Sequence, residues 1–274
     1  MNNSLIIDVG MHTGRDTEFY LKKGFNVVAI EANPELVKQA RSHFQNSLSN
    51  KKLILYDVAI ADFEGEIDFY INKQKDDWGT ISKEFALRNE SLGTSNILIQ
   101  VKCTTFQTIL RQHGIPYYLK IDIEGADILC LKALMEFNDR PKYISYETGL
   151  NSFEETFTEL SLLWNLGYRE FKIVNQLLNN RVRCPNPPLE GLFVDYRFDG
   201  LSSGPFGEEA PGKWMSVEET LVKYRRILTK GKYFSATLKL YKRPFHKLFE
   251  ILRWEPPGWY DIHAKLPNNY KVNQ

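Results

Sequence analysis

The sequence has few cysteines, no long apolar run and no excess of charge of either sign. Cys103, Cys130 and Cys184 are odd in number and far apart, so we expect neither a disulfide framework nor a cysteine-based zinc site. No window approaches the roughly 18 consecutive apolar residues that a membrane-spanning helix needs. Lysine and arginine (35) balance aspartate and glutamate (34), so no overall field would attract nucleic acid.

What remains is the composition of an ordinary globular protein, with 274 residues, 43% of them hydrophobic and 25% charged. A chain of this length can bury a large core and build one or two domains. The first residues, MNNSLIID, contain no basic region followed by an apolar stretch. We therefore expect a cytoplasmic protein in a reducing compartment.

Short apolar runs alternate with helical patterns along most of the chain, which predicts βαβ units around a parallel sheet. The first two strands are expected at 5–9 and 25–30, and Asn33-Pro34 has the residue types of a helix start. Further strands are expected at 53–60, 97–103, 117–123 and 143–147.

Two segments between these strands are less regular. Ile67, Phe69 and Ile71 alternate with polar residues after Glu64-Gly65, which predicts a hairpin strand. Residues 72–96 are polar and poorly periodic, so we expect either a surface excursion or a mobile lid.

The sequence predicts a last pair of strands at 171–174 and 192–198, so the sheet would be complete near Phe198. We therefore divide the chain into a cofactor-binding domain, 1–199, and a helical or irregular appendage, 200–274, that could cover an acceptor site. Ser216 and Glu219 open the expected helix of this appendage as a capping box.

The stretch Asp-Val-Gly-Met-His-Thr-Gly at 8–14 stands at the end of the first strand and has the residues of a ligand-binding turn. Gly10 would allow a tight turn, and Gly14 would let the next helix lie close to ligand and sheet. Glu31 ends the second strand, where an acid can accept hydrogen bonds from both ribose hydroxyls. The alternative is a purely structural turn, but two such elements in this context favour a nucleoside site.

His12 stands where a dinucleotide site has its middle glycine, so a pyrophosphate would be hindered there. S-Adenosylmethionine has no phosphate, and its ammonium and sulfonium suit acids such as Asp8 and Asp122. The pattern therefore favours methyl transfer. A nicotinamide-dependent oxidoreductase and a non-catalytic glycan-binding or scaffold protein remain the alternatives.

Four blocks of the chain occur in an order that resembles the FkbM-type S-adenosylmethionine-dependent methyltransferases, over roughly residues 4–150. The blocks are Asp8-Val-Gly-x-x-x-Gly14, Val28-Ala-Ile-Glu31-Ala-Asn33-Pro34, Asp57-Val-Ala59-Ile-Ala-Asp62 with Gly65, and Lys120-Ile-Asp122-Ile-Glu124-Gly125-Ala126. The resemblance implies a class I methyltransferase (Rossmann-like) α/β fold, a doubly wound sheet whose last strand is antiparallel. It also implies methylation of a hydroxyl on a sugar or natural-product acceptor.

Carried over by position, the resemblance implies a cofactor loop, a ribose-binding acid, residues near the adenine and an acid at the methionine end. These residues are Asp8, Gly10, His12, Gly14, Glu31, Asn33, Asp57, Ala59 and Asp122. The family usually has Ala-Asn after its first glycine, where this chain has Met11-His12. His12 therefore either replaces the asparagine hydrogen bond or contributes something new.

Methyl transfer is an in-line displacement, so orientation supplies most of the catalysis and a base helps when the acceptor is an alcohol. The candidate catalytic residues are Asp122, Glu124, Glu147 and His12. Each of them also has a structural interpretation. Asp122 and Glu124 could bind Mg²⁺ as two neighbouring oxygen ligands, but substrate hydroxyls would have to complete the site, and we expect no metal.

The last part of the chain carries two further patterns. From Lys230 to Arg253 a basic, amphipathic segment could meet an anionic membrane surface, although a helix that packs on the domain is the stronger expectation. Aromatic residues in the tail could stack on a sugar or simply anchor the tail; they are Trp214, Trp254, Trp259 and Tyr260, with Asp261 and His263 nearby. We expect a small-molecule or glycan acceptor and no nucleic acid, while the oligomeric state stays open.

Overall fold

A computed structural model describes residues 2–148, 152–238, 258–268 and 270, with the backbone alone at 230–238. The strands are β1 (Asn2–Val9), β2 (Asn26–Glu31), β3 (Leu53–Asp57), β4 (Ala59–Ala61), β5 (Gly65–Asn72), β6 (Asn96–Thr105), β7 (Pro116–Ile121), β8 (Tyr143–Thr148), β9 (Glu170–Asn175) and β10 (Tyr260–Lys265). The α-helices are α1 (Arg15–Lys22), α2 (Pro34–His43), α3 (Gln45–Ser49), α4 (Lys83–Ser91), α5 (Phe106–His113), α6 (Asp127–Ala133), α7 (Phe153–Asn165) and α8 (Val217–Leu238).

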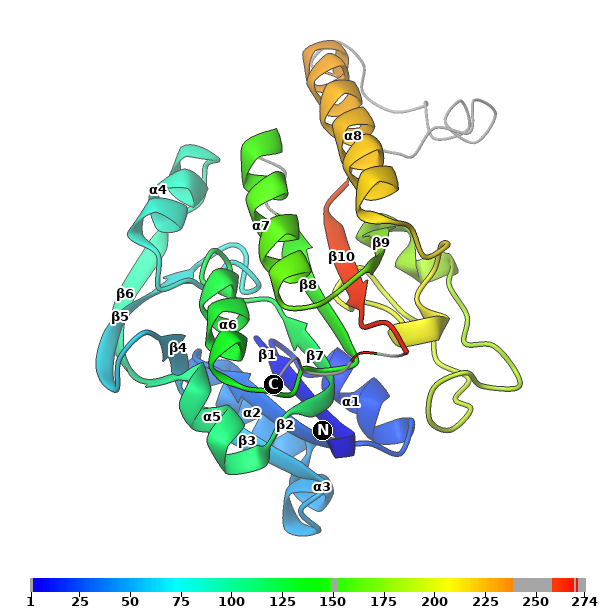
Figure 1. Cartoon of the computed structure of the whole chain (residues 1–274). Coiled ribbons are helices and arrows are strands. Elements are labelled where there is room, and N and C mark those ends of the chain that lie inside the picture. Colours follow the sequence, from blue (N-terminus) through cyan, green and yellow to red (C-terminus); the bar gives the residue numbers. More distant parts are fainter. Residues whose placement is uncertain (1, 149–151, 239–257, 269, 271–274) are drawn as a thin grey trace.

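The main sheet has seven strands in the order β3-β2-β1-β7-β8-β10-β9. All of its strands are parallel to one another except β10, which pairs antiparallel with both β8 and β9. Figure 1 shows β10, in red, between these two strands. The predicted fold class, a doubly wound sheet with an antiparallel last strand, is therefore confirmed.

The prediction of a strand at 192–198, and of a sheet complete near Phe198, is wrong. Tyr196 and Phe198 do alternate with polar residues, but their rings pack against Phe19 of α1 and make no strand pairing. The place beside β9 belongs to β10, so part of the expected appendage is a strand of the main sheet. Whether 1–199 and 200–274 fold as separate units stays a prediction.

The two faces of the main sheet are covered by different parts of the chain. One face packs on α5, α6, α7 and α8 through residues such as Leu119, Ile144 and Leu163. The other face packs on α1, α2 and the connection before α8, through residues such as Tyr20 and Phe206. Both faces are buried, which is why the parallel strands are nearly continuous in apolar residues.

The helix starts follow the expected capping chemistry. Asn33 accepts from the backbone N–H of Glu35 at 3.1 Å and opens α2. Ser216 accepts from the N–H of Glu219 while Glu219 accepts from the N–H of Ser216, a complete capping box before α8.

A second, three-stranded sheet, in the order β4-β6-β5, stands beside the main one with α4 (Figure 1). The predicted strand at 53–60 divides at Val58, whose N–H donates to the carbonyl of Glu31 while β4 turns away to pair with β6. The predicted strand after Gly65 is β5, and its antiparallel partner is β6. The connection between them, residues 72–96, contains α4, which begins at the cap Ser82.

The basic segment from Lys230 to Arg253 lies almost wholly outside the described residues, apart from the backbone of 230–238 at the end of α8. Among the residues that the structure describes, no helix is both long and apolar enough to cross a membrane.

Candidate functional site

A cavity of about 690 Å³ opens at the carboxyl ends of the parallel strands. Most of the predicted site residues line it together, although they come from distant parts of the chain; they are Gly10, His12, Glu31, Asn33, Ala59, Asp122, Glu124 and Glu147. Asp8, Gly14 and Asp57 lie outside this lining. Ligands of doubly wound sheets bind at this edge, so the position is that of a substrate or cofactor site.

Gly10 lies where the loop after β1 passes the turn after β7. Its φ is +82°, and a β-carbon added there would stand 1.8 Å from the carbonyl oxygen of Asp122. Only glycine can occupy this position, because a side chain would collide with backbone. The two turns therefore meet backbone to backbone at the cavity.

Asp8 is fully buried beneath this loop and contacts neighbouring side chains instead of the cavity. Its Oδ2 accepts from the hydroxyl of Thr17 at 2.6 Å, and its Oδ1 lies 3.3 Å from Nζ of Lys120. Lys120 in turn donates to the carbonyl of Gly10 at 2.7 Å and lies 3.5 Å from Oδ2 of Asp122. Burial alone would lower the pKa of Lys120, but the surrounding carboxylates raise it well above its usual value. Lys120 is therefore charged, and it links the turn at Gly10 to the turn at Asp122.

Glu31 is fixed at the end of β2 by two backbone amides. Its carboxylate accepts from the N–H of His12 at 2.7 Å and from the N–H of Asn33 at 2.8 Å. Burial raises its pKa to about 7, although these hydrogen bonds oppose the shift. The carboxylate is held rigidly and lines the cavity, so it can accept further hydrogen bonds from a pair of hydroxyls.

Three carboxylates continue along the same edge of the sheet. Ile121 is opposite Tyr146 in the β7–β8 pair, which sets Asp122 beside Glu147, and Glu147 is directly opposite Asp261 in the β8–β10 pair. Burial and Asp122 raise the pKa of Glu147 to about 8. Burial, Asp122 and Glu147 raise the pKa of Asp261 well above its usual value. The sequence could not place Asp261 here, because β10 was not predicted.

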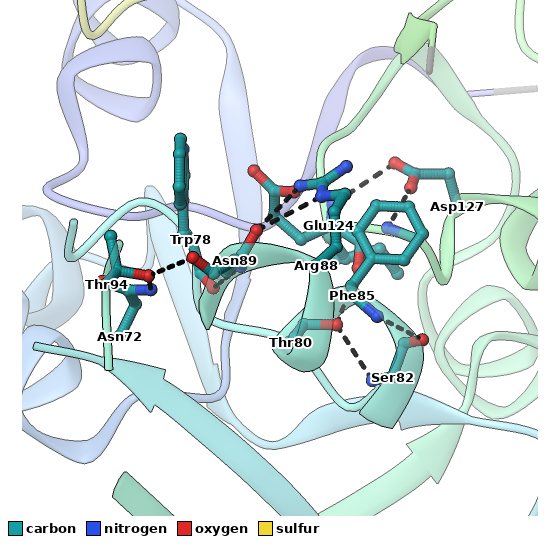
Figure 2. Close-up of polar contacts among 12 residues, drawn as sticks. Asn72, Trp78, Thr80, Ser82, Phe85, Arg88, Asn89, Thr94, Glu124 and Asp127 are labelled. Atoms are coloured by element: carbon teal, nitrogen blue, oxygen red, sulfur yellow. Dashed lines mark hydrogen bonds and ion pairs between the residues drawn. The ribbon is translucent and has the colours of Figure 1, made fainter. Parts of the chain in front are cut away.

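Residues 72–96 cover the turn that carries Glu124, as Figure 2 shows. The hydroxyl of Thr80 donates to the carbonyl of Glu124 at 2.7 Å, and Nη2 of Arg88 lies 3.5 Å from Oε2 of Glu124. The ring of Phe85 lies so close to Gly125 that a β-carbon there would stand 2.6 Å from it. The segment thus covers the cavity, and the contacts of Thr80 and Arg88 with Glu124 hold it there.

The turn itself is tight, and Glu124 has a left-handed φ of +46°. Asp127, at the start of α6, holds the turn by accepting from the N–H groups of Ile123 and Gly125, each at 3.2 Å. Burial, with Glu147 and Asp122 nearby, raises the pKa of Glu124 to about 9, and Arg88 opposes this. Arg88 and Thr80 were missed from the sequence, since they act from a segment without a periodic pattern.

His12 also contacts the cover. Its φ is +52°, and its Nε2 lies 3.3 Å from Oδ1 of Asp76. The imidazole therefore joins the loop after β1 to residues 72–96, while its backbone N–H holds Glu31.

The remaining candidates lie elsewhere. Asp57 has half of its side chain exposed and is 4.0 Å from Arg41, and Gly14 packs beneath Phe44. Trp214 stacks on Tyr143 outside the cavity. Trp254 lies outside the described residues, whereas Trp259 and Asp261 line the cavity.

His263 is buried in β10, where burial and Lys172 lower its pKa to about 3. It is therefore neutral and does not line the cavity. Within the described part of the chain, no group of three or more His, Cys, Asp or Glu side chains has the arrangement of a metal site.

Comparison with known proteins gives one family. Residues 8–170 match the family described as the methyltransferase FkbM domain, and no curated protein matches. Among solved structures, a methyltransferase FkbM from Methylobacillus flagellatus KT is 11% identical with a TM-score of 0.43, over 63% of this chain and 40% of that one. A precorrin-6y C5,15-methyltransferase from Geobacter metallireducens GS-15 is 13% identical with a TM-score of 0.35, over 64% and 68%.

This chain thus covers less than half the length of the Methylobacillus protein, so the activity of that whole protein is not assigned to this chain. The family match is independent of that comparison. Because it spans more than half of the 274 residues and includes the loop after β1, Glu31 and the Asp122–Glu124 turn, the chain belongs to the FkbM methyltransferase family.

Proposed function

We propose that this S-adenosylmethionine-dependent methyltransferase methylates a hydroxyl of a glycan or of a glycosylated metabolite. The observation that carries the proposal is the lining of the cavity beyond Asp122, where Glu124, Glu147 and Gln176 lie together with Trp259. Carboxylates and amides can hydrogen-bond to the hydroxyls of a sugar, and an aromatic side chain offers an apolar face to its ring.

The residues present fit S-adenosylmethionine, which supplies a methyl group already activated by its sulfonium when it is bound. Glu31 would hold the ribose hydroxyls, and Gly10 lets the loop after β1 pack directly on the turn that carries Asp122. Asp122, at the other side of this loop, would face the ammonium group. Ala59 and Val58 line the cavity beyond β2, where the flat ring of the adenine could pack.

In the transfer, the chain itself would orient the acceptor and accept one proton from its hydroxyl. Glu124 is the base that the geometry favours, because its largely buried carboxyl lines the cavity. Its pKa is raised to about 9, so only the ionised fraction can accept a proton, and we expect transfer to increase as pH rises towards 9. Arg88 lies against Oε2, so in ionised Glu124 Oε1 would accept the proton of the acceptor hydroxyl as the acceptor oxygen bonds to the methyl carbon and the methyl–sulfur bond breaks. Phe85 and Arg88 of the segment 72–96 lie against the turn that carries Glu124 and would limit the access of water to this proton transfer.

The test is transfer of a labelled methyl group from S-adenosylmethionine to a panel of oligosaccharides, proteins and small amines. Glu124→Gln keeps the shape of the side chain and removes the base, so we expect transfer to fall by about a hundredfold or more with S-adenosylhomocysteine affinity unchanged. Glu84→Gln is the matched control, since Glu84 is exposed on α4 at the same cavity.

Label on protein or amine acceptors alone would overturn methylation of a hydroxyl. Cofactor binding without transfer to any acceptor in the panel would instead favour a scaffold role.

We also propose a cytoplasmic location. Cys103, Cys130 and Cys184 are all free thiols, and the first two are buried. Free thiols fit a reducing compartment. Fractionation of cells that produce the tagged chain would test this location.

A further inference from the structure

Glu147 and Asp261 have no ion-pair partner within the described residues, although Lys120 attracts Asp261 and Arg88 attracts Glu147 from a distance. Side chains directly opposite one another in an antiparallel pair lie in contact, so two ionised carboxylates there would destabilise the sheet, and Glu147 accordingly raises the pKa of Asp261. Three basic side chains line the cavity, and each is engaged elsewhere in the described structure: Lys120 by Asp8 and Asp122, Arg88 by Glu124, and Lys75 over the ring of Trp78. A cation from outside the chain would therefore stabilise the pair.

Gln176 gives a second, independent sign of a ligand. It follows β9, its backbone N–H donates to the carbonyl of Trp259 at 3.0 Å, and its side chain is almost wholly buried at the cavity. Its Oε1 accepts from Asn179, but its Nε2 has no hydrogen-bond partner among the residues that the structure describes. A buried amide left without a partner costs free energy, so this donor is suited to an oxygen atom of a ligand.

Trp259 completes the arrangement. It precedes β10 by one residue and remains 42% exposed at the cavity. A half-exposed indole can stack on an apolar ring face and also attracts a cation. The ligand that fits all three features has a positive charge, an oxygen acceptor and a ring with an apolar face.

We propose that the acceptor is an amino sugar, with its ammonium group against Glu147 and Asp261, a ring or hydroxyl oxygen on Nε2 of Gln176, and its ring on Trp259. This inference rests on the proposed function, because it names the substrate class of the same cavity. A neutral sugar offers no charge that would favour the ionised form of Glu147 and Asp261.

The experiment measures binding of matched sugars by calorimetry, with saturating S-adenosylhomocysteine. Glucosamine and galactosamine are compared with their N-acetyl counterparts at near-neutral pH, where much of the free amine is charged and its ammonium group can displace the proton that the raised pKa of Glu147 holds there. We expect at least one amine to bind about tenfold more tightly than its N-acetyl form, a factor that corresponds to about 1.4 kcal/mol.

Three variants separate the contributions. Glu147→Gln and Asp261→Asn should each reduce this preference to about twofold or less, because they remove charge and keep shape. Gln176→Leu should weaken binding of both forms of the sugar equally. Glu155→Gln is the control, since Glu155 is an exposed carboxylate on α7 at the same cavity.

The inference is overturned if the N-acetyl sugars bind as tightly as the amines, if the preference survives in both charge variants, or if none of the sugars binds. Failure of S-adenosylhomocysteine to bind the wild-type chain would instead overturn the proposed function. The two failures are therefore distinguishable.

Discussion

Lys23 and Glu209 form an ion pair whose side chains have no exposed surface. Nζ of Lys23 lies 2.7 Å from Oε2 and 2.9 Å from Oε1 of Glu209, and Oε1 also accepts from the N–H groups of Leu189 and Glu190. The pair ties the end of α1 to the long connection before α8. That connection also reaches the cavity, where the N–H of Ser203 donates to Asp16.

Lys23→Met should lower the free energy of unfolding by about 3–5 kcal/mol, because it leaves a buried carboxylate without its cation. Urea denaturation measures this loss. Adding Glu209→Gln should recover part of it, since the amide oxygen still accepts from the two backbone N–H groups. Lys213→Met removes an exposed ion pair with Glu219 and should change the midpoint little, and an equally small effect of Lys23→Met would contradict the role of the buried pair.

Gly10→Ala should abolish binding of S-adenosylhomocysteine and destabilise the chain, because the new methyl would displace the carbonyl of Asp122. Calorimetry and thermal unfolding measure the two effects. Gly93→Ala is the matched control. Gly93 has a similar left-handed φ of +92° but open space around it, so backbone strain should lower the free energy of unfolding of this variant by only about 1–2 kcal/mol. Equal behaviour of the two variants would show that the backbone contact at Gly10 is unimportant.

Glu31→Ala should weaken S-adenosylhomocysteine binding by roughly 10-fold to 100-fold, because a charge-assisted hydrogen bond to a hydroxyl contributes about 1.5–3 kcal/mol. The variant also releases the N–H groups of His12 and Asn33. Glu35→Ala, an exposed acid four residues later, is the control and should bind normally. Unchanged affinity of Glu31→Ala would remove Glu31 from the cofactor site.

The stability of the ligand-free chain should fall as pH rises from about 5 to about 9. Folding raises the pKa of Glu147 to about 8 and of Glu124 to about 9, mainly by burial, from an ordinary value of 4.5. Between these values the folded chain binds more protons than the unfolded chain, so the free energy of unfolding decreases with pH. Thermal unfolding across this range tests the sign, and Glu124→Gln should flatten the decrease. A melting temperature that rises with pH would contradict these pKa shifts.

The parts of the site that could be predicted from the sequence are local. Gly10 and Glu31 stand at the ends of strands with strong apolar patterns, and Asn33 caps the helix that follows. Their neighbours in sequence are also their neighbours in space. A motif of a few residues therefore predicted how this side of the cavity would be built.

The parts that could not be predicted depend on distant segments. Arg88 reaches Glu124 across 36 residues, from a helix with little hydrophobic periodicity. In β10, Tyr260, Ile262 and Ala264 do alternate with polar residues, but Asp261 and His263 are buried as well, so alternation indicated an exposed face that does not exist. Burial of polar groups against one another depends on tertiary contacts that no local pattern contains.

The place of β10 in the sheet has a consequence for synthesis. Residues 176–259 separate it from β9, and at about 5–20 residues per second a ribosome needs roughly 4 to 17 seconds to add them. Throughout this interval β8 and β9 present unpaired edges, the kind of surface on which nascent chains aggregate. The main sheet can therefore be completed only after residues 260–265 have been synthesised, late in the production of the chain.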